Sequence, residues 1–183
     1  MKTIVSSTIL KLIGVAFVVV LLLSSVVQAA NPATITVTVT VQNISVSATG
    51  PIAFGSVATN STTINATSST VTNNGNVAET YSLSLTNPGG WTAVQADPSA
   101  AEQYCLSAIF NSDEPTGGDF AYSDHALSTS SVASSGSKFA GDETGISVAA
   151  AATRTLWLQF EAPTSTSVTA EQSITVTVTA AAS

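Results

Sequence analysis

The chain has 183 residues, 44% hydrophobic and only 8% charged, and four Lys and Arg stand against eleven Asp and Glu for a net charge of -7. Beyond the N-terminal segment the basic residues are Lys138 and Arg154, too few to neutralise a run of phosphates, which excludes nucleic acid as a partner. One His and one Cys cannot build a zinc or iron–sulfur site within one chain, and we expect no cofactor.

The first 29 residues have the pattern of a secretory signal peptide. Lys2 and Lys11 accompany the apolar run Leu12–Leu23, which has the length of an h-region and is short for a membrane span. We expect cleavage after Ala29, no membrane association of the mature chain, and a secreted, extracellular or cell-surface location. The alternative is a retained apolar helix over residues 12–30, as in pilin-like subunits.

The next segment, residues 30–42, holds the clearest strand pattern in the chain. Apolar residues alternate with Thr over residues 34–41, and every position is β-branched. No Lys or Pro interrupts this pattern, although such residues usually protect an edge strand. Two arrangements are open: the segment pairs with residues 173–179 of its own chain, or it is a donor strand that completes the sheet of a neighbouring copy. The donor side chains would be Ile35, Val37, Val39 and Val41.

Residues 43–183 show the short strands and frequent turns of an all-β domain. The apolar phase shifts near residue 42, so a separate strand is expected at 43–47. Further strands are expected at residues 52–57, 62–72, 77–86, 91–94, 104–110, 154–160 and 173–179. This pattern predicts an Ig-like antiparallel β-sandwich of seven to nine strands, with a hairpin turn at residues 73–76. A long acidic excursion, residues 111–147, interrupts it.

Two motifs carry a resemblance to a known class of domain. Phe54-Gly55-Ser56-Val57-Ala58 is followed, after a Ser/Thr-rich strand, by the sequence VTNNGNVAETY at residues 71–81. This arrangement resembles the hydin/abnormal-spindle type of Ig-like domain found in exported bacterial or archaeal surface proteins. The resemblance implies a structural or adhesive role and carries over no catalytic residue; the excursion at 111–147 departs from the pattern.

The residues that could support chemistry are few. His125 follows Asp124, but no G-x-S-x-G motif is present, and we expect a solvated loop histidine. Cys105 is expected to be a small buried hydrophobic residue. Three carboxylates in the excursion are weak candidates for a calcium site, because Ca²⁺ prefers oxygen ligands. The alternative is that these carboxylates belong to a solvated loop and bind no metal. The three residues are Asp113, Glu114 and Asp119.

Other surface features bear on an exported protein. Trp157 falls on the strand face opposite Leu156 and Leu158, so it is expected to point away from the core. Three N-x-S/T sequons are glycosylation candidates if the host glycosylates exported chains. They begin at Asn43, Asn60 and Asn65.

Together these patterns predict a structural protein and no enzyme. We expect a subunit of an extracellular filament or surface layer whose partners are further copies of itself, joined by β-strand addition through residues 34–41. The alternative is a monomeric secreted adhesion or binding module that recognises a cell-surface glycan or protein through residues 111–147.

Overall fold

The computed structural model describes residues 32–183 and divides the chain into two units, Met1–Thr40 and Val41–Ser183. The predicted signal peptide, its cleavage site and the alternative retained helix lie outside the described residues. Of the first unit, residues 32–40 are described, and they have no regular secondary structure. Over residues 32–183, no helix has the length and the apolar character that a membrane crossing requires.

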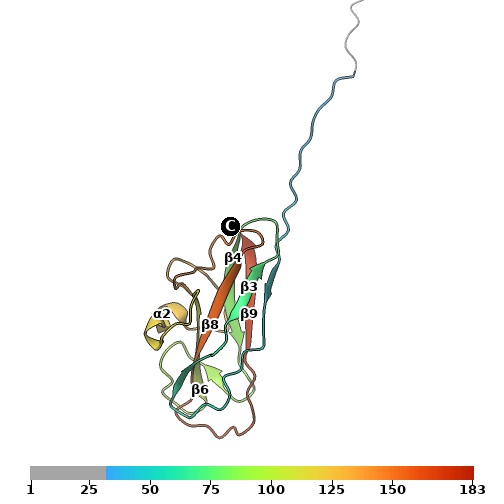
Figure 1. Ribbon diagram of the computed structural model, residues 1–183. Coiled ribbons are helices and arrows are strands. Elements are labelled where there is room, and N and C mark those ends of the chain that lie inside the picture. Colours follow the sequence, from blue (N-terminus) through green and yellow to red (C-terminus); the bar gives the residue numbers. More distant parts are fainter. Residues whose placement is uncertain (1–31) are drawn as a thin grey trace, which may run out of the picture. The chain divides into compact units, whose positions relative to one another are not determined.

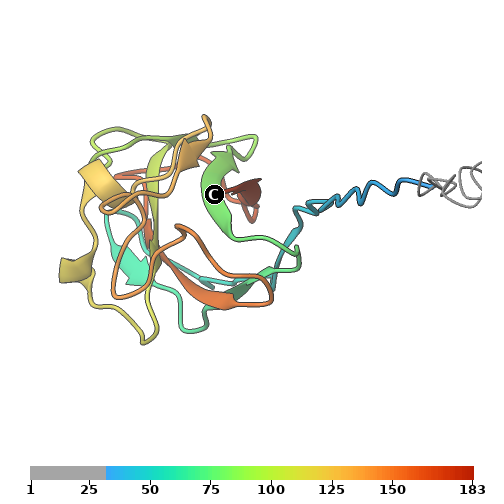
Figure 2. The same ribbon diagram turned by 90° about the horizontal axis from the view of Figure 1, so that it is seen from above.

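The second unit contains two β-sheets, which confirms the predicted all-β sandwich (Figures 1 and 2). The larger sheet has the order β1–β3–β8–β6–β5, and β2 pairs with a further part of β8. Its strands are β1 (Val46–Ala48), β2 (Thr62–Ile64), β3 (Ser69–Asn73), β5 (Thr92–Ala93), β6 (Gln103–Phe110) and β8 (Thr153–Glu161). The smaller sheet has the order β7–β4–β9. Its strands are β4 (Glu79–Thr86), β7 (Val132–Ala133) and β9 (Thr175–Ala182).

The antiparallel prediction holds for every strand pair except one. The two-residue β5 runs parallel to β6, and all other pairs between the named strands are antiparallel. Helical structure in residues 32–183 is limited to the 3₁₀ turn η1 (Gly117–Asp119) and the single-turn α2 (Tyr122–His125).

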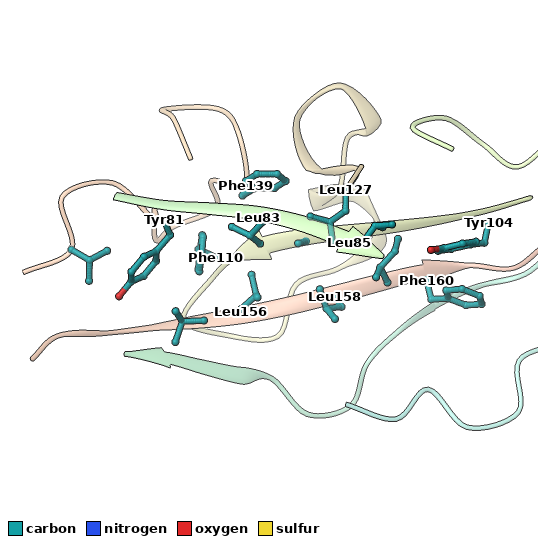
Figure 3. Packing of buried hydrophobic residues seen from close by; sticks show 14 of the residues in the cluster. Tyr81, Leu83, Leu85, Tyr104, Phe110, Leu127, Phe139, Leu156, Leu158 and Phe160 are labelled. Carbon is teal, nitrogen blue, oxygen red and sulfur yellow. The ribbon is translucent and has the colours of Figure 1, made fainter. Parts of the chain in front are cut away.

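Strand β4 shows how the alternating sequence pattern forms the core. Tyr81, Leu83 and Leu85 are at most 3% exposed, whereas the residues between them are only partly buried. Figure 3 shows these side chains between β4 and β8, where Leu156 and Leu158 belong to the same cluster. Complete burial of such a side chain contributes about 1.5–3 kcal/mol. The period of two therefore determines which face of β4 is turned inward.

The excursion at residues 111–147 is not the solvated loop that the sequence suggested. It covers the outer face of β6 and β8, because the Trp157 indole N–H donates to the Asn111 carbonyl at 3.1 Å and the Tyr122 hydroxyl donates to Glu161 Oε2 at 2.8 Å. As a result, six side chains on that outer face are at most 8% exposed. They are Cys105, Ser107, Ile109, Trp157, Gln159 and Glu161.

Two other predictions are corrected. Residues 52–57 form no strand, although Ile52, Phe54 and Val57 pack against the core as partly buried side chains. Residues 73–76 do not form a hairpin, because β3 and β4 lie in different sheets. The turn therefore carries the chain from one sheet to the other. Residue types that favour a tight turn do not determine whether the next strand pairs with the preceding one.

Candidate functional site

The predicted donor segment, residues 34–41, forms no strand in the structure. Strand β9 pairs with β4 alone within the described residues. The four apolar side chains of the donor segment are between 75% and 89% exposed. They are Ile35, Val37, Val39 and Val41.

A single asparagine attaches the end of this segment to the sandwich. Asn76 donates from Nδ2 to the Val41 carbonyl and accepts at Oδ1 from the Asn43 N–H, in both cases at 2.8 Å. Glu79, three residues beyond Asn76, pairs with Ala182 at the end of β9. Val41 is therefore attached at the end of the sandwich where β9 finishes.

The same turn fixes the following residues through a close backbone approach. The buried Glu79 accepts from the Ser45 N–H at Oε1, at 2.8 Å. A Cβ on Gly75 would lie 2.4 Å from both the Asn43 carbonyl oxygen and Glu79 Oε1, so only glycine fits. The residue types at 73–76 predict a turn but not its role as an anchor, because the partner residues lie more than thirty positions away in the sequence.

The edge of β9 that faces away from β4 has unpaired backbone groups. The Ser183 N–H donates to the Ala78 carbonyl at 3.0 Å, which extends the β4–β9 ladder and shows that the odd-numbered residues of β9 bond to β4. The N–H and C=O groups of Val176, Val178 and Ala180 must then point to the opposite edge. No strand among the described residues pairs with that edge.

The core-facing side chains of β9 are also incompletely covered. They belong to the cluster around the core, but each remains partly exposed, in contrast to the core residues of β4 with at most 3% exposure. The incompletely covered residues are Ile174, Val176, Val178 and Ala180. An alternating apolar row at an unpaired edge is suited to receiving another strand.

Strand β1 lies near β9 and has a free edge of its own. The Thr49 N–H donates to the Thr70 carbonyl, and the Asn74 N–H donates to the Ser45 carbonyl, so the odd positions of this segment bond to β3. The backbone groups of Val46 and Ala48 face away from β3, and no strand among residues 32–183 pairs with them. Two unpaired edges are thus neighbours at one side of the sandwich.

The structure does not bring the calcium candidates together. Asp119 Oδ2 accepts from the Thr116 N–H at 2.7 Å and from its hydroxyl at 2.8 Å, and these bonds lower the pKa of Asp119. Asp113 and Glu114 are exposed. Within residues 32–183, no three or more His, Cys, Asp or Glu side chains gather as a metal site would require.

The three sequons differ in accessibility. Asn43 and Asn60 are exposed. Asn65 is 1% exposed, and its Oδ1 accepts from the Leu158 N–H at 2.6 Å while its Nδ2 donates to the Thr67 carbonyl. Asn65 is therefore inaccessible to a glycosyltransferase in the folded chain, and Asn43 and Asn60 remain the candidates.

His125 and Cys105 are buried structural residues. His125, expected to be solvated, is 6% exposed; its Nδ1 accepts from the Ala121 N–H at 2.8 Å, and its Nε2 lies 3.2 Å from the Ala140 carbonyl oxygen. The prediction that Cys105 is buried is confirmed, and burial raises the pKa of its thiol to about 11. A thiol with such a pKa is protonated at neutral pH and is a weak nucleophile.

Glu161 is the one buried carboxylate beneath the excursion. Burial raises its pKa, the hydrogen bond from the Tyr122 hydroxyl opposes this rise, and the charge of Asp97 adds to it. Burial is also the main cause of the raised pKa of Tyr122. This pair is part of the packing between the excursion and β8.

No family model, no curated protein and no solved structure matches this chain. The resemblance to hydin-type Ig-like domains therefore stays a prediction from the motifs. The site is defined by this chain's own geometry: one alternately apolar segment, residues 34–41, and two sheet edges that have no strand partner among residues 32–183.

Proposed function

We propose that this protein is a structural subunit of an extracellular filament or surface layer, and that its copies join by β-strand addition with residues 34–41 as the donor strand. The observation that carries the proposal is the exposure of 75% to 89% at the four apolar side chains of an otherwise ideal strand sequence. They are Ile35, Val37, Val39 and Val41.

The physical argument is that the sequence of this segment favours a β-strand, whereas residues 34–41 form no strand within the described part of the chain. Burying each of its four apolar side chains in an acceptor would contribute about 1.5–3 kcal/mol. The main chain of residues 34–41 has no proline, so every N–H is available to a partner strand. In strand addition, the main-chain hydrogen bonds between donor and acceptor give affinity, and the pockets for alternate donor side chains fix the register.

An extracellular location is supported by the sequence. The signal-like pattern of residues 1–29 and the scarcity of charged residues favour export. Accessible sequons at Asn43 and Asn60 would allow glycans on the surface of an exported chain if the host adds them. If the apolar segment at residues 12–30 were retained instead, it would supply a second means of assembly.

The alternative of a monomeric binding module has less support. Its proposed recognition loop, residues 111–147, is folded against β6 and β8 and contributes Leu127 and Phe139 to the core. Several of its carboxylates are bound within the domain: Asp142 accepts from the Ser112 N–H at 2.7 Å. The assembly proposal is therefore the better supported of the two.

The experiment compares purified chains containing residues 30–183 and residues 41–183. The shorter chain retains Val41 and Asn43, so the attachment to Asn76 is kept. The longer chain is expected to sediment as polymers and the shorter as a folded monomer with a cooperative thermal unfolding transition. Equal polymerisation of both chains, or a longer chain that stays monomeric at all concentrations, would contradict the proposal; the second result would favour the binding module.

A further inference from the structure

The strand order of the sandwich has one vacant position. In an Ig sandwich the sheets have the orders A-B-E-D and C-F-G. Here β1, β3, β8 and β6 correspond to A, B, E and D, while β4 and β9 correspond to C and F. These six strands also follow one another along the chain in the order A to F. Within residues 32–183, no strand occupies the position of G, beside β9.

The vacant position coincides with the unpaired edges. A G strand would bond to the outer edge of β9, where the backbone groups of Val176, Val178 and Ala180 have no strand partner in the described part of the chain. It would also cover the core-facing side chains of β9, which are only partly buried. Among the described residues, the sandwich therefore lacks a single strand, and that strand would lie beside β9.

The donor segment matches this position in length and character. Residues 34–41 and β9 are each eight residues long, or roughly 26 Å when extended. Neither contains a charged residue, so no ion must be buried when they meet. Four apolar donor residues correspond in number to the four partly exposed core-facing residues at positions 174, 176, 178 and 180.

The attachment of Val41 prevents residues 34–41 from occupying the G position of their own sandwich antiparallel to β9. The G strand of an Ig sandwich runs antiparallel to F, which would place Val41 beside Ile174, at the start of β9. However, Asn76 holds Val41 at the opposite end, where Glu79 pairs with Ala182. Since the full length of β9 separates the two ends, the antiparallel donor must come from another molecule.

From these observations we infer that residues 34–41 of one copy occupy the vacant G position of the next copy, antiparallel to β9. This inference rests on the proposed function and names its acceptor. The register that uses all four apolar donor residues places Ile35 opposite Ala180 and Val41 opposite Ile174. The two intermediate pairs are Val37 with Val178 and Val39 with Val176.

The inferred arrangement also determines the type of assembly. Each copy presents its donor at the end of the sandwich where β9 finishes and receives a donor whose Val41 lies where β9 begins. The two surfaces are different, so the contact is heterologous and runs head to tail, which yields an open filament when the rotation between copies does not close a ring. A closed two-fold dimer would instead require like surfaces to meet.

Paired cysteines test both the acceptor and the direction. Thr36 would face Thr179 in the inferred register, and Thr179 bonds to β4, so this is a non-hydrogen-bonded pair with a Cα separation of about 4.5 Å. That separation permits a disulfide. The matched control uses Thr175, which would face Thr36 if the donor were parallel to β9. Both variants carry Cys105→Ala, and each is oxidised after assembly of residues 30–183.

The expected result is a ladder of covalent multimers on non-reducing gels for T36C/T179C and none for T36C/T175C. A ladder from T36C/T175C alone would overturn the inferred direction. A T36C/T175C disulfide within a monomer would show the segment folded onto its own β9 and would overturn both proposals. Filaments without either disulfide would overturn this acceptor while leaving strand addition in place, and the absence of filaments in the parent chain would overturn the proposed function itself.

Discussion

The buried Glu161 links the packing of the excursion to pH. Its pKa is raised in the folded chain, mainly by burial, so its contribution to stability is fully present below the pKa of the unfolded chain and is lost as pH rises through the folded value. Replacement by Gln keeps the shape and an acceptor for the Tyr122 hydroxyl but removes the charge. We therefore expect E161Q to raise the unfolding temperature at pH 8, by about 2–4 °C, and to change it little at pH 4.

Thermal unfolding followed by circular dichroism at the two pH values measures this effect. The matched control is E171Q, because Glu171 is exposed and should show the same small difference at both pH values. An E161Q variant whose difference from the parent is the same at pH 4 and pH 8 would contradict the assignment of a raised pKa to Glu161.

Single-residue predictions from the sequence succeeded where the period of a strand decides burial. The inward positions of β4, such as Leu83, follow from alternation along one strand, whereas Cys105 lies on the outer face of β6 and is buried because the excursion covers that face. Trp157 does lie on the face opposite Leu156, but it is 8% exposed because the excursion covers that face. His125, expected to be solvated, is buried within the excursion, where its ring contacts the backbone of Ala121 and Ala140. Packing of this kind leaves no periodic signal in the sequence.

The donor segment permits a test at the level of one element. In the inferred register Val37 and Val39 face the core of the acceptor, while Thr36 and Thr38 face solvent. We expect V37E/V39E to abolish polymerisation, since burying two unpaired carboxylates costs several kcal/mol, and T36E/T38E to reduce it far less. Both variants should retain a cooperatively unfolding sandwich, because residues 32–40 form none of its strands.

Sedimentation of assembled material measures the two variants at equal protein concentration. The pairs add the same charge to the same segment, so a difference between them reports which face is buried. Equal polymerisation of V37E/V39E and the parent would show that the apolar face of residues 34–41 is not inserted into a partner.

Elements were predictable where hydrophobic period and turn residues agree. The strands observed as β4, β6, β8 and β9 all overlap predicted ones. Residues 52–57 carry apolar residues at similar spacing but do not pair with a strand, since pairing depends on a neighbour that local sequence does not specify. The turn at 73–76 was located correctly, yet its path between sheets depends on tertiary packing.

At the scale of the whole molecule, the sequence predicted the all-β class and the donor candidate but not the acceptor. The similarity of residues 34–41 and 173–179 suggested that the two pair, without showing whether they do so within one chain. That choice depends on which end of the sandwich holds Val41, and hence on the Asn76 contact, which joins residues far apart in sequence. The vacant G position likewise depends on the order of strands in both sheets.

Electron cryo-microscopy of the assembled protein, residues 30–183, tests the central claim most directly. We expect a polymer in which every sandwich has an additional strand antiparallel to β9, continuous with the chain of the neighbouring subunit. Uniform monomers, or a polymer in which the edge of β9 is unoccupied or is filled by residues 34–41 of the same chain, would contradict the claim.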